Sequence, residues 1–538
     1  MTSPSPPSSG DSPWTPFDGP QSVEARSLSI WPLDEHNAAL LNEVRPRDHL
    51  ETPSPDPPEY DLVALGAGAG GLVSSKQSAR RGARSALVSG GLAGGDCLVA
   101  GCVPSKALLR SARAVAEVRK AVREMGVTVS GKTGEEVEVG ADFGAVMRRL
   151  RRLRATIAPA DSHGATRAAG ADVYQGFGRL TGPRSLEVNG KALRFRKLVL
   201  ATGGRPHVPP EVPGLLDAPY VTSETLFNLE RLPPRTVVLG SGVIALEMAQ
   251  ALSLLGSRVT VVGRAPRLLS PAGDAEAGRL LRAALEKEGV EFLLGETVGD
   301  VATLSRGGGD VLPLLAVTAG DRRIECECLL VAAGRRPNVE GIGLEEAGVD
   351  YDPRRGVLVD DLARSVSNPD VYAVGDCVAE VPRLTHMAGE MAKVVVQNAL
   401  AGDQWKLSSL VVPAVCYTHP EYAAVGVSSE EDAESRGLAV DVYRTGLEHN
   451  DRAILEGNNE GFVKIVVAEG TDRILGATIV AERAGEMLNE VTLAMRHGIG
   501  LRGIGRNVHA YPTMGEAVMG CGIQYINKHW SRLDKGGE

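Results

Sequence analysis

Two copies of one sequence pattern constrain the fold of this chain more than any other feature. Each copy has an apolar stretch typical of a β-strand, a glycine-rich turn and a segment of helical composition: "YDLVALGAGAGGLVSSKQSARRG" from residue 60 and "RTVVLGSGVIALEMAQALSLLG" from residue 235. The glycines allow a tight turn and let backbone N–H groups approach a pyrophosphate at the helix N-terminus. The sequence therefore predicts an α/β fold with two Rossmann-like dinucleotide-binding domains.

The spacing of the glycines identifies candidate dinucleotide contacts. The acidic residue that accepts ribose hydroxyls at the end of the second strand is missing from both copies, because Ser89 and Gly263 stand there. Arg264 follows, and an arginine at this place can pair with a 2′-phosphate, so we expect NADPH, with NADH as the second choice. A solvated surface arginine is the alternative interpretation. The candidate contacts are Gly66, Gly68, Gly71, Gly240, Gly242 and Arg264.

Length, charge and cysteine content narrow the class of protein. The 538 residues are enough for three or four domains. The net charge of −9 argues against a nucleic-acid partner or an anionic membrane surface, and no stretch stays apolar for the roughly 18 residues that span a bilayer. Seven cysteines are too few for a disulfide framework and favour a reducing, cytoplasmic compartment. We expect residues 1–58 to be disordered or extended, with a short helix within residues 27–50 that docks on the body.

Two of the cysteines lie in "GGDCLVAGCVPSK", residues 94–106, with four residues between them. The spacing alone is compatible with a metal site, a structural bridge or a redox pair. A structural zinc site needs two further Cys or His ligands at short spacing, and none lies near in the sequence. A thiolate close to a helix N-terminus and a cation is stabilised, so such a pair can be nucleophilic at neutral pH.

Three further segments carry a resemblance to a known family. "LVLATGGRP" (198–206), "LLVAAGRRPN" (329–338) and "VYAVGDC" (371–377) resemble, in order and spacing, flavin-domain segments of the class I pyridine nucleotide-disulfide oxidoreductases, and within them mercuric reductase and mercuric-reductase-like proteins. The resemblance implies FAD at the first site, NAD(P)H at the second, and a homodimer. The implied domains are an FAD-binding domain at 59–218 and 341–408, an NAD(P)H-binding domain at 219–340 and an α+β dimerisation domain at 409–538.

The resemblance also assigns roles to single residues. Cys97 would be the outer thiol that meets the substrate, and Cys102 the inner thiol against the flavin, the two cycling between disulfide and dithiol. Lys106 would pair with Glu247 beneath the flavin. A helix that begins within residues 384–392 would direct its N-terminus at the flavin ring and stabilise negative charge there.

Flavin contacts follow from the same resemblance. Asp376 would bind the ribityl chain of FAD and offset the loss of the acid at Ser89. No resident metal ion is expected. The implied flavin contacts are Thr202, Gly203, Gly375 and Asp376.

The segment "HAYPTMGEA", residues 509–517, bears on the electron acceptor. Disulfide and dithiol reductases of the family carry His-Pro-Thr followed by a glutamate, whereas this chain has Tyr511, with Glu516 at the glutamate position. A phenol with a pKa near 10 is a poor proton shuttle at neutral pH, and a tyrosine here resembles mercuric reductase. The adjacent cysteine pair near the C-terminus of mercuric reductase is missing, since only Cys521 is present.

We therefore expect an enzyme, an FAD-dependent NADPH oxidoreductase whose Cys97–Cys102 disulfide passes electrons to a thiophilic metal ion or another small acceptor. A disulfide or dithiol reductase of the glutathione reductase or dihydrolipoyl dehydrogenase type is the alternative, and Tyr511 counts against it. A non-catalytic flavin-binding module is a third hypothesis, motivated by Ser89 and by the missing histidine.

Overall fold

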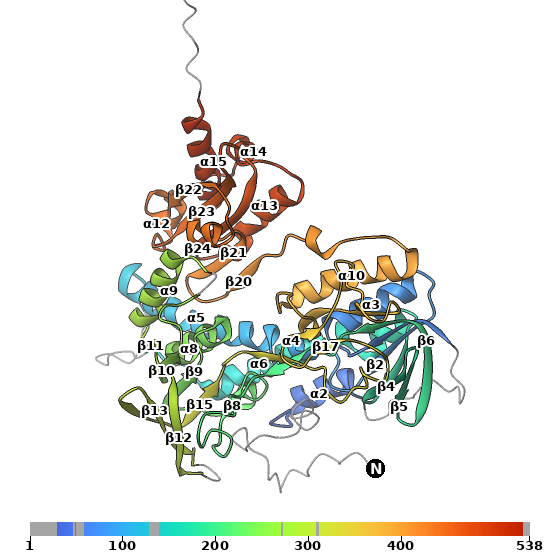
Figure 1. Cartoon of the computed structure of the whole chain (residues 1–538). Coiled ribbons are helices and arrows are strands. Elements are labelled where there is room, and N and C mark those ends of the chain that lie inside the picture. Colours follow the sequence, from blue (N-terminus) through green and yellow to red (C-terminus); the bar gives the residue numbers. More distant parts are fainter. Residues whose placement is uncertain are drawn as a thin grey trace, which may run out of the picture. The chain divides into compact units, whose positions relative to one another are not determined.

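The computed structural model describes residues 30–46, 49, 59–128, 139–270, 273–307 and 311–530. These residues form two compact units, each described by itself (Figure 1). The first unit takes the described residues of Met1–Gly240, Leu255–Val259 and Thr297–Ser408. The second takes those of Ser241–Leu254, Thr260–Glu296 and Ser409–Glu538.

A sheet with β1 (Tyr60–Leu65) near its centre organises the first unit. β2 (Ser85–Ser89) and β6 (Lys191–Leu200) flank β1 in parallel, and β19 (Val371–Ala373) pairs in parallel with the carboxyl end of β6. Every residue of β2 is buried, as expected of a parallel strand covered on both faces. The other strands of this sheet and the helices of the same region are β3 (Asp172–Gln175), β4 (Gly178–Gly182), β5 (Ser185–Val188), α3 (Ala69–Arg80), α4 (Gly95–Val99), α5 (Cys102–Glu124), α6 (Phe143–Asp161), α7 (His163–Ala168) and α10 (Thr385–Ala401).

A second parallel sheet follows the second copy of the sequence pattern. β9 (Arg235–Leu239), α8 (Val243–Leu255) and β10 (Arg258–Gly263) come in the predicted order, and the strand order of the sheet is β11-β10-β9-β15-β8. The two sheets confirm the prediction of two Rossmann-like domains. The remaining elements are β7 (Gly204–Pro206), β8 (Val221–Thr222), α9 (Ala275–Lys287), β11 (Val290–Leu294), β12 (Val298–Ser305), β13 (Leu314–Ala319), β14 (Arg322–Cys326), β15 (Cys328–Val331), β16 (Arg335–Pro337), β17 (Tyr351–Asp352) and β18 (Gly356–Val357).

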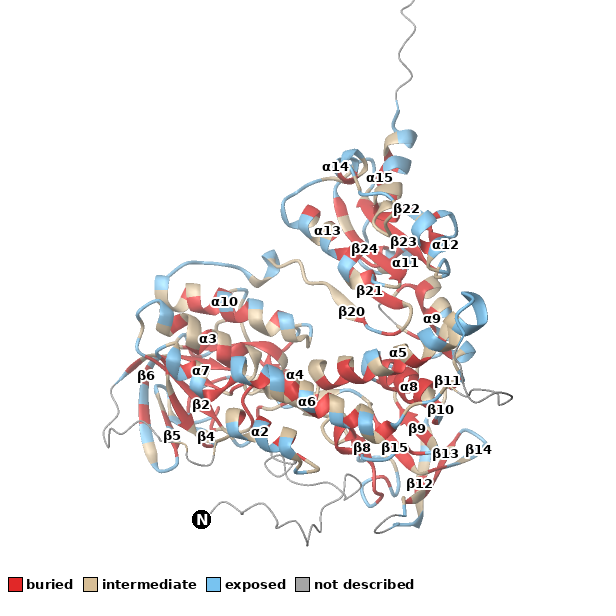
Figure 2. Ribbon diagram, turned by 180° about the vertical axis from the view of Figure 1, so that it is seen from behind, coloured by how far each residue is buried: buried red, intermediate tan, exposed pale blue. Residues whose placement is uncertain are grey.

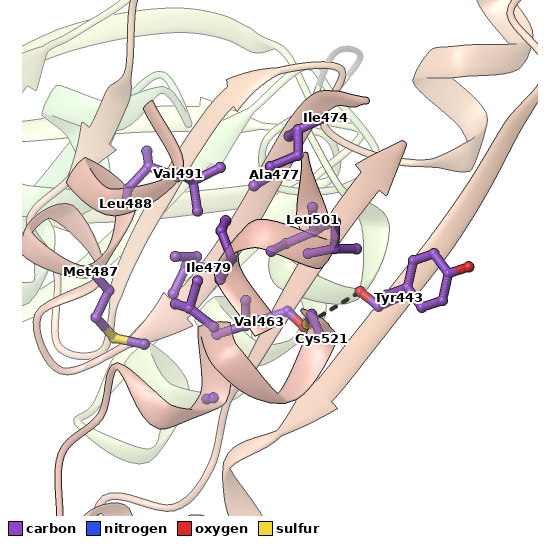
Figure 3. Packing of buried hydrophobic residues seen from close by; sticks show 14 of the residues in the cluster. Tyr443, Val463, Ile474, Ala477, Ile479, Met487, Leu488, Val491, Leu501 and Cys521 are labelled. Atoms are coloured by element: carbon purple, nitrogen blue, oxygen red, sulfur yellow. Dashed lines mark hydrogen bonds between the residues drawn. The ribbon is translucent and has the colours of Figure 1, made fainter. Parts of the chain in front are cut away.

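The C-terminal part of the second unit is an α+β domain, as predicted. Its antiparallel sheet has the order β20-β21-β24-β23-β22, and β23 and β24 are buried over nearly their whole length (Figure 2). Cys521 lies in the apolar core, where its Sγ is 3.5 Å from the backbone oxygen of Tyr443 (Figure 3). The elements are β20 (Ala414–Cys416), β21 (Glu421–Gly426), α11 (Glu430–Ser435), β22 (Val440–Gly446), α12 (Asp451–Leu455), β23 (Phe462–Ala468), β24 (Ile474–Ala481), α13 (Ala484–Arg496), α14 (Leu501–Arg506) and α15 (Glu516–Lys528).

The N-terminal segment contributes a helix, α2 (Glu35–Val44). The Asp34 side chain caps its first turn, and Leu40 and Val44 are buried where α2 packs against α6 (Figures 1 and 2). The short helix expected within residues 27–50 is present. The broader prediction of a disordered or extended segment over residues 1–58 does not hold for residues 30–46, because their apolar face is buried. Residues 1–29, 47–48 and 50–58 lie outside the described part of the chain.

Candidate functional site

The turn between β1 and α3 has the shape that a bound pyrophosphate needs. Gly66 has a φ of 112°, and a Cβ there would clash with the Ala201 carbonyl. A Cβ on Gly71 would clash with the Gly66 carbonyl, so α3 can start close to the strand only with glycine there. Around Gly68 the space is open, since a Cβ would meet only the Gly95 Cα, at 4.0 Å. The turn therefore leaves room for phosphate oxygens at the N-terminus of α3, which fits FAD.

Ser89 is not available as a ribose contact. It is fully buried, and its Oγ lies 3.0 Å from Nε2 of His163, which is itself 2% exposed. Burial, followed by the neighbouring His49 and Arg167, lowers the pKa of His163 to about 4, so this imidazole is neutral at pH 7. The buried serine–histidine pair thus occupies the end of β2, where an acidic residue would otherwise accept the ribose hydroxyls.

Asp376 lies in a short turn after β19, next to Gly375, and is paired with an arginine that the sequence analysis missed. Asp376 Oδ2 accepts from Arg335 Nε at 3.0 Å, and Arg335 also forms an ion pair with Asp96, the neighbour of Cys97. Burial alone would lower the pKa of Arg335, but the two carboxylates raise it overall. One guanidinium thus ties the turn that carries Cys97 to the predicted ribityl contact.

Thr202 and Gly203 follow β6, and Asn338 holds both. Thr202 Oγ1 donates to the Asn338 carbonyl at 2.6 Å, and Asn338 N donates to the Gly203 carbonyl at 3.0 Å. Gly203 has a φ of 68°, and a Cβ there would meet nothing within 4 Å. This open, glycine-lined position suits a flavin contact, which stays a prediction.

The two cysteines of the C-x4-C pair lie together. Cys97 is in α4, Cys102 is the first residue of α5, and the two thiols are hydrogen-bonded to each other. Cys102 Sγ lies 3.2 Å from Oγ1 of Thr385, the first residue of α10. The pKa of Cys102 is lowered to about 6, chiefly by the hydrogen bond from Cys97. The hydrogen bond with Thr385 and the positive charge of Lys106 lower it further, whereas burial opposes the shift.

The same hydrogen bond, together with burial, raises the pKa of Cys97 above its ordinary value. The two shifts favour a thiolate on Cys102 and a protonated thiol on Cys97 at neutral pH. The roles of inner and outer thiol stay predictions. α10 begins at Thr385, inside the predicted range 384–392.

The second dinucleotide turn is also open. Gly240 has a φ of 120°, and a Cβ on Gly242 would meet nothing within 4 Å. Arg264 follows β10 and is exposed, whereas Arg267 donates to a Glu431 carboxylate oxygen at 3.0 Å. Arg264 therefore remains the candidate for contact with a 2′-phosphate, and this contact stays a prediction.

Glu247 is buried in α8 at 3% exposure, where its Oε1 accepts from the backbone N–H of Tyr417 at 3.0 Å. Lys106 lies in the second turn of α5, and its charge stabilises the Cys102 thiolate. The ion pair expected between Lys106 and Glu247 stays a prediction.

Tyr511 is 71% exposed, and its hydroxyl donates to Asp451 Oδ2 at 2.7 Å, which raises the pKa of the phenol further. Glu516 accepts from the backbone N–H of Thr513 at 3.0 Å, so it caps the turn before α15. His509, which could stand in for the missing histidine, has its Nε2 2.9 Å from a Glu490 oxygen and a side chain only 8% exposed. The described residues around Tyr511 thus hold the phenol in its protonated form.

The described residues bring together no group of three His, Cys, Asp or Glu side chains that could hold a metal ion. Within the same residues, every helix is too short or too polar to cross a bilayer.

Comparison of the sequence with known protein families identifies the family to which this geometry belongs. Residues 60–392 match the family described as pyridine nucleotide-disulphide oxidoreductase, and residues 412–520 match the dimerisation domain of that family. The chain belongs to this family. FAD and NAD(P)H are its cofactors, and the C-terminal α+β domain is its dimerisation domain.

Relatives within the family refine the comparison. A dihydrolipoyl dehydrogenase from Thermus scotoductus is 36% identical over 86% of this chain and 96% of that protein. A mercuric reductase from Lysinibacillus sphaericus is 30% identical over 96% of this chain and 91% of that protein. The crystal structure of LpdA from Mycobacterium tuberculosis has a TM-score of 0.75 and 25% identity, covering 86% of this chain and 99% of that one.

The finer expectation of a mercuric-reductase-like protein is supported only in part. Mercuric reductase is among the relatives, but the dihydrolipoyl dehydrogenase has the higher identity, so the relatives favour the dithiol/disulfide alternative. Tyr511 alone does not decide the acceptor, because one residue of the acceptor site says little about the rest of the chain.

Proposed function

We propose that this flavin-dependent oxidoreductase takes electrons from NADPH and exchanges them with a dithiol/disulfide substrate through Cys97 and Cys102. The observation that carries the proposal is the placement of the two thiols: they are hydrogen-bonded to each other, and Cys102 is the first residue of α5, 3.2 Å from Thr385 Oγ1. This placement lowers the pKa of Cys102 and raises the pKa of Cys97. Bound FAD would supply the two-electron transfer between the nicotinamide and the disulfide. We also propose a homodimer, which the dimerisation domain supports.

The chain's own residues supply the exchange steps. Reduction of the Cys97–Cys102 disulfide takes two electrons and one proton, leaving a thiol on Cys97 and a thiolate on Cys102. Once Cys97 loses its proton, its sulfur attacks the substrate disulfide, forms a mixed disulfide and releases one substrate thiolate. Cys102 then attacks Cys97 Sγ, which restores the protein disulfide and releases the second substrate thiolate.

A thiophilic metal ion is the second candidate acceptor, and Tyr511 favours it. Because its hydrogen bond to Asp451 raises its pKa, the phenol is a poor base for the Cys97 proton at neutral pH. A metal ion that binds thiolates and takes two electrons depends less on such a base. Cys521 is not suited to deliver the ion, since burial raises its pKa to about 11 in the C-terminal core.

Acceptor turnover by the purified holoenzyme tests the proposal. NADPH oxidation would be followed with oxidised lipoamide, glutathione disulfide and Hg(II), using wild type and Cys97→Ser. We expect the wild-type enzyme to reduce one of the two disulfides, and we expect Cys97→Ser to abolish this turnover. Disulfide turnover that survives the substitution would refute the cysteine relay. Turnover with Hg(II) alone would establish the second candidate in place of the first.

Tyr511→His isolates the role of the phenol. In the proposed homodimer, the family resemblance implies that this position reaches the active site of the partner subunit. An imidazole there, near its usual pKa of about 6.5, could accept the Cys97 proton, so we expect about tenfold or more faster disulfide turnover near pH 7. Tyr351→His is the matched control, because it makes the same exchange in the first unit. A Tyr511→His rate equal to that of the control would contradict the proton-transfer argument.

A further inference from the structure

The chain between β2 and the cysteine pair has little rigidity of its own. Residues 90–101 contain five glycines, and Gly94 and Gly95 have φ values of 86° and 57°. α4 has five residues, too few to be stable as an isolated helix. Contacts from other parts of the chain must therefore fix the position of Cys97.

The N-terminal segment supplies contacts to the first half of this stretch. Ala93 N donates to the carbonyl of Val44, the last residue of α2, at 3.1 Å. The next residue, Arg45, donates through Nη1 to the Gly90 carbonyl at 2.8 Å. The end of α2 thus holds the loop that leads into α4.

Arg154 of α6 connects α2 with the far end of α4. Its Nη1 donates to the carbonyl of Val99, the last residue of α4, at 2.7 Å, and its Nη2 donates to Asn37 Oδ1 at 2.9 Å. Arg154 is 1% exposed and Asn37 is 0% exposed. Burial, with a smaller contribution from Arg151, lowers the pKa of Arg154 to about 10.

α2 and its N-cap residue Asp34 contribute oxygen atoms that let Arg154 and Arg151 stay buried. A guanidinium removed from water is stable only where protein oxygens replace the water. Asn37 provides one for Arg154, and Asp34 provides another for Arg151, whose Nε lies 2.5 Å from Asp34 Oδ2. Without the Asn37 oxygen, one guanidinium N–H group of Arg154 would be buried without a hydrogen-bond acceptor. That cost would favour a conformation in which Arg154 reaches water and no longer donates to the Val99 carbonyl.

We propose that α2 is a positioning element of the cysteine pair, acting through Asn37 and Arg154 on the α4 turn that carries Cys97. The proposal rests on the redox role proposed for Cys97 and Cys102. The hydrogen bond from Cys97 is the largest contribution to the stability of the Cys102 thiolate. A shift of α4 weakens that hydrogen bond and disfavours the thiolate.

The pH dependence of Cys102 alkylation in the reduced, full-length holoenzyme tests this proposal. Iodoacetamide labelling would be quantified by mass spectrometry for wild type, Asn37→Ala and Asn37→Asp, well below the unfolding temperature of each. Asn37→Asp keeps an oxygen for Arg154. Asn42→Ala is the matched control, because Asn42 lies on the exposed side of the same helix.

We expect Asn37→Ala to raise the alkylation midpoint by about 0.5 pH unit or more, a threefold loss of the thiolate-to-thiol ratio below the midpoint. The alkylation midpoints of Asn37→Asp and Asn42→Ala should equal that of wild type. An Asn37→Ala profile that superimposes on wild type overturns the positioning role alone. A wild-type profile without a midpoint below about pH 8 overturns the proposed redox pair as well. Should Asn37→Ala not fold, Arg154→Lys takes its place, because an ammonium group cannot reach both oxygens as a guanidinium does.

Discussion

Replacement of Thr385 by valine is expected to raise the pKa of Cys102. Valine keeps the shape of threonine but removes the hydroxyl that lies 3.2 Å from the Cys102 sulfur. A hydrogen bond to a charged group contributes about 1.5–3 kcal/mol, and one pKa unit corresponds to about 1.4 kcal/mol. Because the thiol is partly exposed, the lower end applies, and the pKa should move from about 6 to about 7. The thiolate fraction at pH 7 would then fall from about nine-tenths to about one-half.

Alkylation of the reduced protein as a function of pH measures this shift directly. Thr492→Val, on α13 in the other unit, controls for the loss of a threonine hydroxyl in general. A midpoint for Thr385→Val within about 0.3 pH unit of wild type would refute the claim that this hydroxyl stabilises the thiolate, since that shift is worth under 0.5 kcal/mol.

Three further predictions concern the nucleotide sites and the buried histidine. Arg264→Glu should shift the ratio of kcat/KM for NADPH over NADH about tenfold or more toward NADH, and an unchanged ratio in steady-state kinetics would disprove the 2′-phosphate contact. Gly66→Ala should lower the free energy of unfolding by about 1–3 kcal/mol, because φ is 112° and the Ala201 carbonyl blocks a Cβ; an unchanged urea midpoint contradicts this. As pH falls from 6.5 toward 4, the unfolded chain binds a proton that folded His163 does not, so the free energy of unfolding should fall by up to about 3 kcal/mol. His163→Gln should reduce that fall in the free energy of unfolding. Urea denaturation at pH 7 and pH 4.5 measures it, and an equal loss in wild type and in His163→Gln would contradict the prediction.

Local patterns were enough to predict the two dinucleotide turns. The positive φ of Gly66 and of Gly240, and the close approach of α3 at Gly71, are requirements within one strand–turn–helix unit. The helix within residues 27–50 was also predictable, because a helical composition is a local feature.

Contacts between distant segments were not predictable from one sequence. Arg335 and Asp96 are 239 residues apart, and no periodicity or spacing links them. The sequence shows that Ser89 replaces an acidic residue, but only the fold reveals that Ser89 is hydrogen-bonded to His163. For the same reason, Asn37 carries no sign in the sequence that it supports a buried arginine of α6.

The central claim is that Cys102 presents a thiolate to the flavin once the disulfide is reduced. An anaerobic titration of the holoenzyme with NADPH, followed by visible absorption in wild type and Cys102→Ser, tests it most directly. The account predicts a long-wavelength thiolate-to-flavin band that grows in wild type and is absent from Cys102→Ser. Flavin bleaching that is identical in the two proteins, with no such band in either, would contradict it.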